Sequence, residues 1–166
     1  MKKIAMMIVA LAMTLSANAQ FEQGKYYLGA SMTSFDASYS GLEEFKLGVD
    51  AKAGYFFMDN LMAYGQVGYK HYGQEAIPDY FMAGVGARYY IVQNGIFLGA
   101  NGKYVHASSN YNDFMPGVEV GYAFLINGTV SIEPAIYYDQ SFKKHSDYSV
   151  VGIRIGIGIN TRNYFK

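Results

Sequence analysis

Charged residues keep to one side of an alternating pattern that runs through most of this 166-residue chain. Eight segments alternate in polarity, and successive side chains on a β-strand point to opposite faces. In the last segment, Val151 and Ile153 share one parity, whereas Arg154 takes the other. The pattern predicts eight strands, each with one charge-free face. The segments are Lys25–Phe35, Phe45–Phe56, Leu61–Lys70, Tyr80–Tyr90, Ile96–Val105, Met115–Leu125, Thr129–Asp139 and Ser149–Asn160.

One parity carries all the charges of these segments, and the other carries none. Two kinds of structure show this pattern: a soluble sandwich or barrel that turns its apolar face inward, and a membrane barrel that turns the same face toward lipid. In the membrane barrel the charges form a lumenal network. Its candidate members are Lys46, Asp50, Lys52, Lys70, Arg88, Lys103, Glu119, Glu133, Asp139 and Arg154, with Lys25 at the rim.

Glycine separates the two possibilities. Only Gly65 and Gly102 lie on the apolar parity of the segments, whereas twelve glycines share the parity of the charges. The interior of an eight-stranded barrel is narrow and needs small residues, whereas a water-exposed face does not. The sequence therefore predicts an all-β fold, an eight-stranded antiparallel up-and-down transmembrane β-barrel. The twelve are Gly29, Gly48, Gly54, Gly68, Gly84, Gly86, Gly99, Gly117, Gly121, Gly152, Gly156 and Gly158.

Aromatic residues on the apolar parity gather at the strand ends, while the strand centres are mostly Ala, Val, Leu and Ile. Transmembrane barrels place aromatic girdles at the two membrane–water interfaces, on either side of an apolar band. The predicted girdle residues are Tyr26, Phe45, Tyr55, Tyr69, Phe81, Tyr89, Tyr104, Tyr122, Phe124 and Tyr138.

The first 19 residues have the form of a secretory signal peptide. Lys2 and Lys3 precede an uncharged apolar stretch, Ile4–Leu15, and the small residues of Ser16–Ala19 follow. We expect cleavage after Ala19, because signal peptidase requires small residues there. A retained N-terminal helix is the alternative, although the stretch is short for a bilayer. The predicted domains are the signal peptide at 1–19 and the barrel at 20–166, located in the outer membrane of a Gram-negative cell.

The connections alternate in length, which predicts an orientation. Short turns of such barrels face the periplasm and longer loops face outside. Both chain ends are then periplasmic. The predicted turns are Phe57–Asn60, Ile91–Gly95 and Ile126–Gly128, and the predicted loops are Asp36–Glu44, His71–Asp79, His106–Phe114 and Gln140–Tyr148.

Several strings of the chain resemble the small eight-stranded outer-membrane barrels typified by the OmpA membrane domain and OmpX. The strings are 84–90 (GVGARYY), 116–122 (PGVEVGY) and 133–138 (EPAIYY). The resemblance covers residues 20–166 and implies insertion by the outer-membrane insertion machinery, which recognises a terminal aromatic residue in this family. Phe165 is the candidate for this insertion signal. Because Lys166 follows it, the chain departs from the family pattern of a terminal aromatic residue. After Asn160 only six residues remain, so we expect no peptidoglycan-binding domain.

We expect a structural role in envelope integrity, with the lumen plugged by the charged network. In the family such a network can also act as a gate, so the alternative function is that of a narrow gated channel. The strand number argues against a diffusion porin, because aqueous channels need about 16 strands. The expected surroundings are outer-membrane lipid and lipopolysaccharide. We expect a monomer without cofactor, and a net charge of zero gives no reason to expect nucleic acid.

A lipid A-modifying hydrolase is a distant alternative, because His106-Ala107-Ser108 resembles the His-x-Ser pair of an eight-stranded deacylase. A serine nucleophile needs a base, and the base needs an orienting group. Glu119, the available carboxylate, has lumenal parity and is expected to lie away from His106. We therefore predict no catalytic residues and no enzyme activity.

The predicted outer loops offer two further possibilities. His71 and His145 fall in separate loops, so we predict no metal site. Tyr39, Tyr111 and Tyr148 are candidates for a surface that binds a ligand or attaches to cells. The shortness of the loops limits such adhesion.

Overall fold

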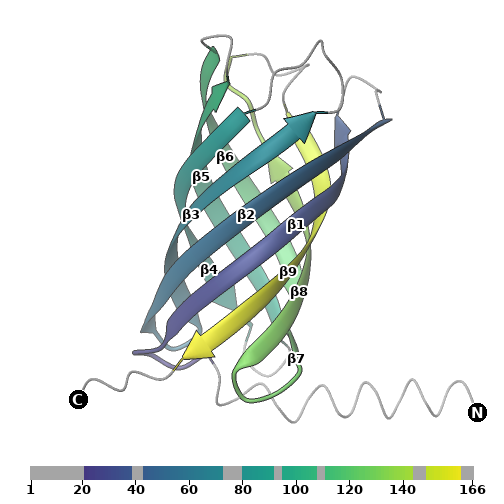
Figure 1. Cartoon of the computed structure of the whole chain (residues 1–166). Coiled ribbons are helices and arrows are strands. Elements are labelled where there is room, and N and C mark those ends of the chain that lie inside the picture. Colours follow the sequence, from purple (N-terminus) through teal and green to yellow (C-terminus); the bar gives the residue numbers. More distant parts are fainter. Residues whose placement is uncertain are drawn as a thin grey trace, which may run out of the picture.

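The computed structural model describes residues 21–38, 43–72, 80–91, 95–107, 111–143 and 149–161. These residues form a barrel of tilted antiparallel strands, with the short turns and both ends of the described chain at the same end (Figure 1). The strands are β1 (Tyr26–Ser38), β2 (Glu43–Met58), β3 (Leu61–Tyr72), β4 (Tyr80–Tyr90), β5 (Ile96–Ala107), β6 (Tyr111–Tyr122), β7 (Phe124–Leu125), β8 (Val130–Asp139) and β9 (Val150–Thr161).

The strands close into a ring of eight wall positions. Strands β1 to β6 pair in chain order, β8 pairs with β6, β7 and β9, and β1 pairs with β9. The register of β6 against β8 continues unchanged into β7, so β6 and β7 form one wall position. The break at Ala123 follows Tyr122, which faces Pro134 in this register, and proline has no N–H for the ladder. The predicted eight-stranded barrel is confirmed.

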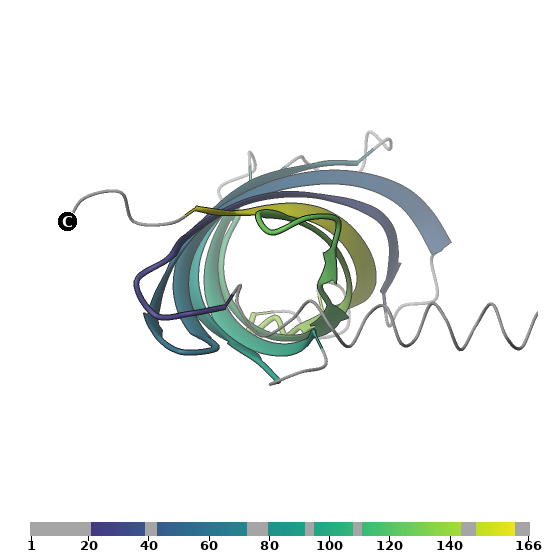
Figure 2. The same cartoon turned by 90° about the horizontal axis from the view of Figure 1, so that it is seen from below.

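The polarity of the barrel is the reverse of that of a soluble protein. Lys103, Glu119 and Asp50 are among its most deeply buried side chains, whereas Val85 and Ile155 are exposed on the outer wall. Viewed along its axis, the wall surrounds a single lumen (Figure 2). A lipid bilayer stabilises an apolar exterior around a charged interior. Closure of the ladder also gives the backbone groups of the strands hydrogen-bond partners within the wall. No helix in the described part of the chain is long and apolar enough to cross a membrane.

Several strands extend further than the alternation predicted. β1 continues through Ser38, β3 through Tyr72 and β5 through Ala107, while β6 begins at Tyr111. The predicted loops 36–44, 71–79 and 106–114 are therefore too long. Backbone pairing continues past the segments whose sequence alternates clearly between polar and apolar residues.

A β-bulge in β1 also changes its register against both neighbouring strands. The register of β1 shifts by one residue between Thr33 and Phe35 against both neighbours. Strict alternation would give Phe35 the lumenal parity of Thr33. The bulge instead places Phe35 opposite Ile153, which is exposed on the outer wall.

Candidate functional site in the barrel lumen

A shallow hollow of about 1050 Å³ lies over the outer wall, but it is an unpromising site. Its lining is mainly small or apolar outward residues, such as Ala30, Ala53 and Val67. Such a surface fits the hydrocarbon of a bilayer. The polar chemistry of the described residues is concentrated instead in the lumen.

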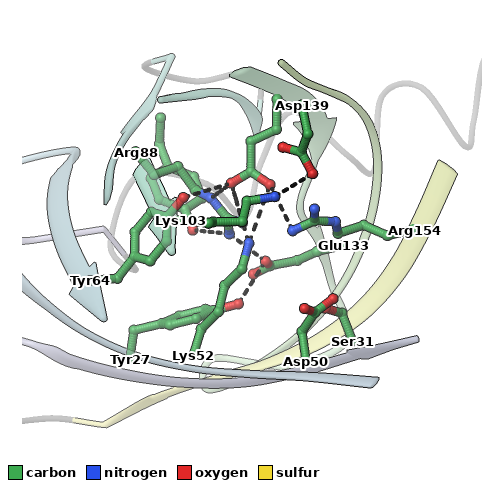
Figure 3. A network of polar contacts seen from close by, with 12 residues as sticks. Tyr27, Ser31, Asp50, Lys52, Tyr64, Arg88, Lys103, Glu133, Asp139 and Arg154 are labelled. Atoms are coloured by element: carbon green, nitrogen blue, oxygen red, sulfur yellow. Dashed lines mark hydrogen bonds and ion pairs between the residues drawn. The ribbon is translucent and has the colours of Figure 1, made fainter. Parts of the chain in front are cut away.

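Glu119 of β6 is the centre of the lumenal network. Figure 3 shows this network in close-up, with the cations Lys52, Arg88 and Arg154 labelled. Glu119 Oε1 accepts hydrogen bonds from Arg88 Nε at 3.0 Å and Arg88 Nη2 at 2.7 Å. Its Oε2 lies 3.2 Å from Lys52 Nζ and 3.4 Å from Arg154 Nη1. Three cations from β4, β2 and β9 therefore converge on one carboxylate that is 2% exposed.

The glycine facing Glu119 allows this convergence. Gly99 of β5 stands opposite Glu119 in the register, and a Cβ atom at Gly99 would lie 2.6 Å from Glu119 Cγ. The missing side chain lets Glu119 lean across β5 toward Arg88 on β4. This is the close approach for which a glycine-rich lumenal face was predicted.

Arg88 joins a second carboxylate to the first. Its Nη1 donates to Glu133 Oε2 at 2.7 Å and to the Tyr90 hydroxyl at 3.1 Å. Glu133 also accepts hydrogen bonds from Tyr27 Oη and Ser131 Oγ, each at 2.8 Å. Arg88 therefore links β4 to β6 and β8 across the lumen, and Tyr27 links β8 to β1.

A separate ion pair joins Lys103 of β5 to Asp139 of β8. Gly117 of β6 lies between these strands and faces Asp139 in the register. A Cβ atom at Gly117 would collide with Asp139 Oδ1. The pair therefore depends on a glycine, as Glu119 does.

Aromatic rings line the spaces between the charges. The guanidinium of Arg88 lies 4.0 Å from the centre of the Phe97 ring, and that of Arg154 lies 4.3 Å from the Tyr137 ring. Lys52 Nζ lies 5.0 Å from the Tyr64 ring. A cation over a desolvated ring gains about 2 kcal/mol, so these rings stabilise buried cations that share one counter-ion.

The described charges in the middle of the lumen balance, while buried Lys25 and Asp113 lie toward its two ends. Four buried cations, Lys52, Arg88, Lys103 and Arg154, accompany four buried carboxylates. A cavity of about 10 Å³ beside Tyr27 is the size of about one water molecule. The middle of the lumen is thus filled by paired side chains. The four carboxylates are Asp50, Glu119, Glu133 and Asp139.

Asp50 is less well satisfied than the others. Its Oδ2 accepts a long hydrogen bond of 3.4 Å from Ser31 Oγ, and its Oδ1 has no partner among the described residues. Lys46 and Lys70, also predicted for the network, lie in β2 and β3, but their side chains are outside the described part of the structure. Other buried atoms without a described partner are Gln66 Nε2, Asn101 Oδ1, Asp139 Oδ1, Arg154 Nε, and Nδ2 and Oδ1 of Asn160.

The predicted rim and girdle residues have definite places. Lys25 is buried just before β1 and pairs with Glu22 at 3.3 Å. Tyr122 and Tyr138 are half-buried, and the side chain of Phe45 is outside the described part. The other seven predicted girdle residues are exposed on the outer wall: Tyr26, Tyr55, Tyr69, Phe81, Tyr89, Tyr104 and Phe124.

No protein-family model and no curated protein sequence matches the chain. The barrel is similar to solved structures. Neisserial surface protein A has a TM-score of 0.59 and 15% identity, with 82% of this chain and 97% of that chain covered. The N-terminal β-barrel domain of Pseudomonas aeruginosa OprF has a TM-score of 0.62 and 13% identity, with 84% and 98% covered.

Ail, the attachment invasion locus protein of Yersinia pestis, has a TM-score of 0.51 and 13% identity, with 84% of this chain and 99% of that chain covered. The fold is that of a small outer-membrane β-barrel. At these identities the likeness establishes the fold and leaves the role open.

Within this barrel, the His106 and Glu119 side chains lie on opposite sides of the wall. His106 belongs to β5, where its side chain is exposed and its Nδ1 lies 2.6 Å from Asn112 Oδ1. The prediction that His106 begins a loop is wrong, because the ladder continues through Ala107 to its partner Tyr111. Ser108 lies outside the described residues. Glu119 points into the lumen, as its parity predicted.

The structure also corrects the position of His71, which was predicted to begin a loop. His71 lies in β3 opposite Leu47 of β2, because the β2–β3 ladder continues to Tyr72. Within the described ranges, no group of three or more His, Cys, Asp or Glu residues could hold a metal ion. His145, Tyr39, Tyr148 and Phe165 lie outside those ranges, as do residues 1–20.

Sequence reasoning missed the lumenal aromatics as members of the site. Parity would have found them, because Tyr90 is two residues from Arg88 and Tyr137 lies between Glu133 and Asp139 on the same face. Tyrosine was assigned only to the girdles, where amphipathic rings are common. In the lumen tyrosine rings pack against cations, and the hydroxyls of Tyr27 and Tyr64 donate to Glu133 and Glu119.

We predict that Glu133→Ala lowers the heat resistance of the folded barrel. Arg88 loses one partner, and the hydroxyls of Tyr27 and Ser131 lose their acceptor, which costs about 1.5–3 kcal/mol for hydrogen bonds to a charged group. The measurement is the temperature at which the compact band on a gel converts to the unfolded band. Ser131→Ala removes one neutral donor and is the matched control with a smaller shift. An unchanged temperature for Glu133→Ala would contradict pairing in the lumen.

Proposed function

We propose that this protein is a sealed structural barrel of the Gram-negative outer membrane that contributes to envelope integrity and catalyses no reaction. The observation that carries the proposal is the buried Glu119 carboxylate with its three cations. Breaking a buried ion pair costs about 3–5 kcal/mol, so a network held by several such contacts opposes opening. The four-to-four charge balance leaves the middle of the lumen no net charge that would select an ion.

The proposal also includes the contacts of the barrel with the membrane and its orientation there. The apolar outer wall contacts outer-membrane lipid and lipopolysaccharide, and the insertion machinery places the barrel in the membrane as a monomer. The short turns at Asn60 and Gly95, both with positive φ, face the periplasm together with the chain ends. Positive φ suits asparagine and glycine in tight reversals.

Conductance and cell physiology test this function together. Purified protein in a planar bilayer is expected to give no stepwise current. Deleting the gene is expected to increase the sensitivity of cells to detergent and to bulky antibiotics, with recovery when the gene is restored. Steady single-channel steps from the unmodified protein, or unchanged sensitivity after deletion, would argue against a sealed envelope component.

A narrow gated channel is the second candidate, and the unpaired polar atoms favour it. Asp50 Oδ1, Asn101 Oδ1 and Gln66 Nε2 are buried without a described partner. Buried polar groups of this kind are usually satisfied by internal water. A wet segment above or below the ion pairs would conduct only when the Glu119 contacts open. Brief current steps that become frequent in Glu119 variants would support this candidate.

Surface binding is the third candidate. The rings of Phe114 and Phe142 stack with their centres 6.3 Å apart, and both are exposed. Ail, the attachment invasion locus protein, has the same fold. Replacing residues 110–113 and measuring binding to host cells tests this role, and loss of binding would support it.

A further inference from the structure

The five residues before β1 form a distinct structural element at the turn end of the barrel. In Figure 2 this purple segment enters the open end of the ring before the chain turns outward into β1. Gly24 N donates to Phe56 O at 2.8 Å, and Asn60 N donates to Phe21 O at 2.6 Å. Gln23 N donates to Asp59 Oδ1 at 2.8 Å. Phe56 N in turn donates to Lys25 O at 3.0 Å, so the segment is tied to the end of β2 and to the β2–β3 turn.

Phe21 places its ring inside the barrel mouth. The side chain is 3% exposed and stacks on Tyr90, with the ring centres 3.9 Å apart and the planes 15° from parallel. The Phe56 ring lies 6.0 Å away. Phe97 and Met62 belong to the same buried cluster. An apolar layer thus closes the lumen at this end.

This layer lies directly against the charged network. The Tyr90 hydroxyl accepts a hydrogen bond from Arg88 Nη1, and the Phe97 ring lies against the Arg88 guanidinium. Water entering from this end would raise the local dielectric and weaken the attraction between Arg88 and its carboxylates. Excluding water from the mouth therefore protects the ion pairs behind it.

We propose that Phe21–Lys25 is an end plug that seals the turn-end mouth of the lumen and opens as a unit while the barrel wall stays intact. Apart from hydrogen bonds to Phe56 and Phe57 at the end of β2, the plug is held by hydrogen bonds to Asp59 and Asn60 of the β2–β3 turn. Phe21 supplies the apolar contact that holds it closed. The proposal concerns access from one end and is separate from the sealing of the lumen centre by Glu119.

The sequence contains no cysteine, so an introduced thiol reports access without interference. Ala123→Cys places the reporter in the buried cluster with Phe21, and Ser131→Cys places a second one beside Glu133. The probe is a charged, membrane-impermeant methanethiosulfonate applied to purified barrel in detergent. We expect slow labelling of both reporters, and labelling faster by about tenfold or more with Phe21→Ala, since burying a Phe ring shifts an opening equilibrium by that much.

Two further variants make the test specific to the plug. Phe21→Leu retains an apolar side chain and is expected to keep labelling slow. Asp59→Ala removes the acceptor of Gln23 N without touching the ring or the wall, and is expected to accelerate labelling moderately. A compact band on an unheated gel verifies the fold of each variant. Rapid labelling in the parent, or equal rates in all folded variants, would overturn the plug.

The labelling test of the plug and the conductance test of the proposed function can fail independently of each other. A barrel without stepwise current in which the Phe21 variants label no faster is sealed by its centre alone. Faster labelling in Phe21→Ala with no stepwise current supports two independent seals, one apolar and one ionic.

Discussion

Replacing Glu119 by alanine is expected to lower the free energy of unfolding by about 3–5 kcal/mol, the cost of breaking a buried ion pair by removing one partner. Arg88 keeps Glu133, but Lys52 and Arg154 lose the carboxylate nearest to them. The measurement is urea unfolding in lipid vesicles. Circular dichroism is the suitable probe, because the chain contains no tryptophan.

Two substitutions control for this result. Glu119→Gln keeps the shape and removes the charge, and it is expected to be nearly as destabilising as alanine. Glu22→Ala removes a carboxylate whose side chain is 56% exposed and pairs with Lys25. An exposed pair contributes at most about 1 kcal/mol. Equal unfolding midpoints for Glu119→Ala and Glu22→Ala would mean that the lumenal pairs contribute nothing.

Replacing Val85 by arginine is expected to destabilise the membrane-inserted barrel by about 2–4 kcal/mol, the cost of a cation on the lipid face near the bilayer midplane. Val85 is 71% exposed and lies in the middle of β4, away from the aromatic residues at the strand ends. The same substitution on a water-facing wall would be nearly neutral. The experiment compares urea midpoints in vesicles and thereby tests which way the wall faces.

Phe142→Arg is the matched control for Val85→Arg. Phe142 is 70% exposed, almost the same as Val85, but it follows the end of β8 and stacks on Phe114, which faces the girdle residue Tyr104. Near the interface the cost of arginine falls to about 0–1 kcal/mol. If both variants unfolded at the same urea concentration, a wall surrounded by lipid would be contradicted.

The alternating positions of charged residues and glycines predicted the fold, because both are needed at every second residue of a strand, where the side chain faces a narrow interior. Lys103 and Glu119 could be assigned to the lumen before any partner was known. Their partners could not be predicted. Arg88 reaches Glu119 across β5 only because Gly99 leaves space, and such diagonal contacts depend on strand tilt and register, which alternation does not encode.

Other features of the structure could not be predicted, because they do not change the alternation of polar and apolar residues in the sequence. The bulge between Thr33 and Phe35 inserts one residue without any local change in composition. The ladder beyond Val105 contains polar residues, so His106 was assigned to a loop although it lies in β5. Phe21 precedes the first alternating segment and has no parity to read. Each of these positions is fixed by contacts with residues distant in the sequence.

The seam between β1 and β9 pairs the first strand of the chain with the last, from Tyr26 opposite Thr161 to Ser38 opposite Val150. A nascent chain that ends before β9 has two open edges and no way to satisfy them in hydrocarbon. Synthesis must therefore be complete before the cylinder can close, and removal of the last strand is expected to abolish assembly altogether. Joining the adjacent ends of β1 and β9, where Tyr26 faces Thr161, and opening a connection elsewhere would move this dependence to another strand.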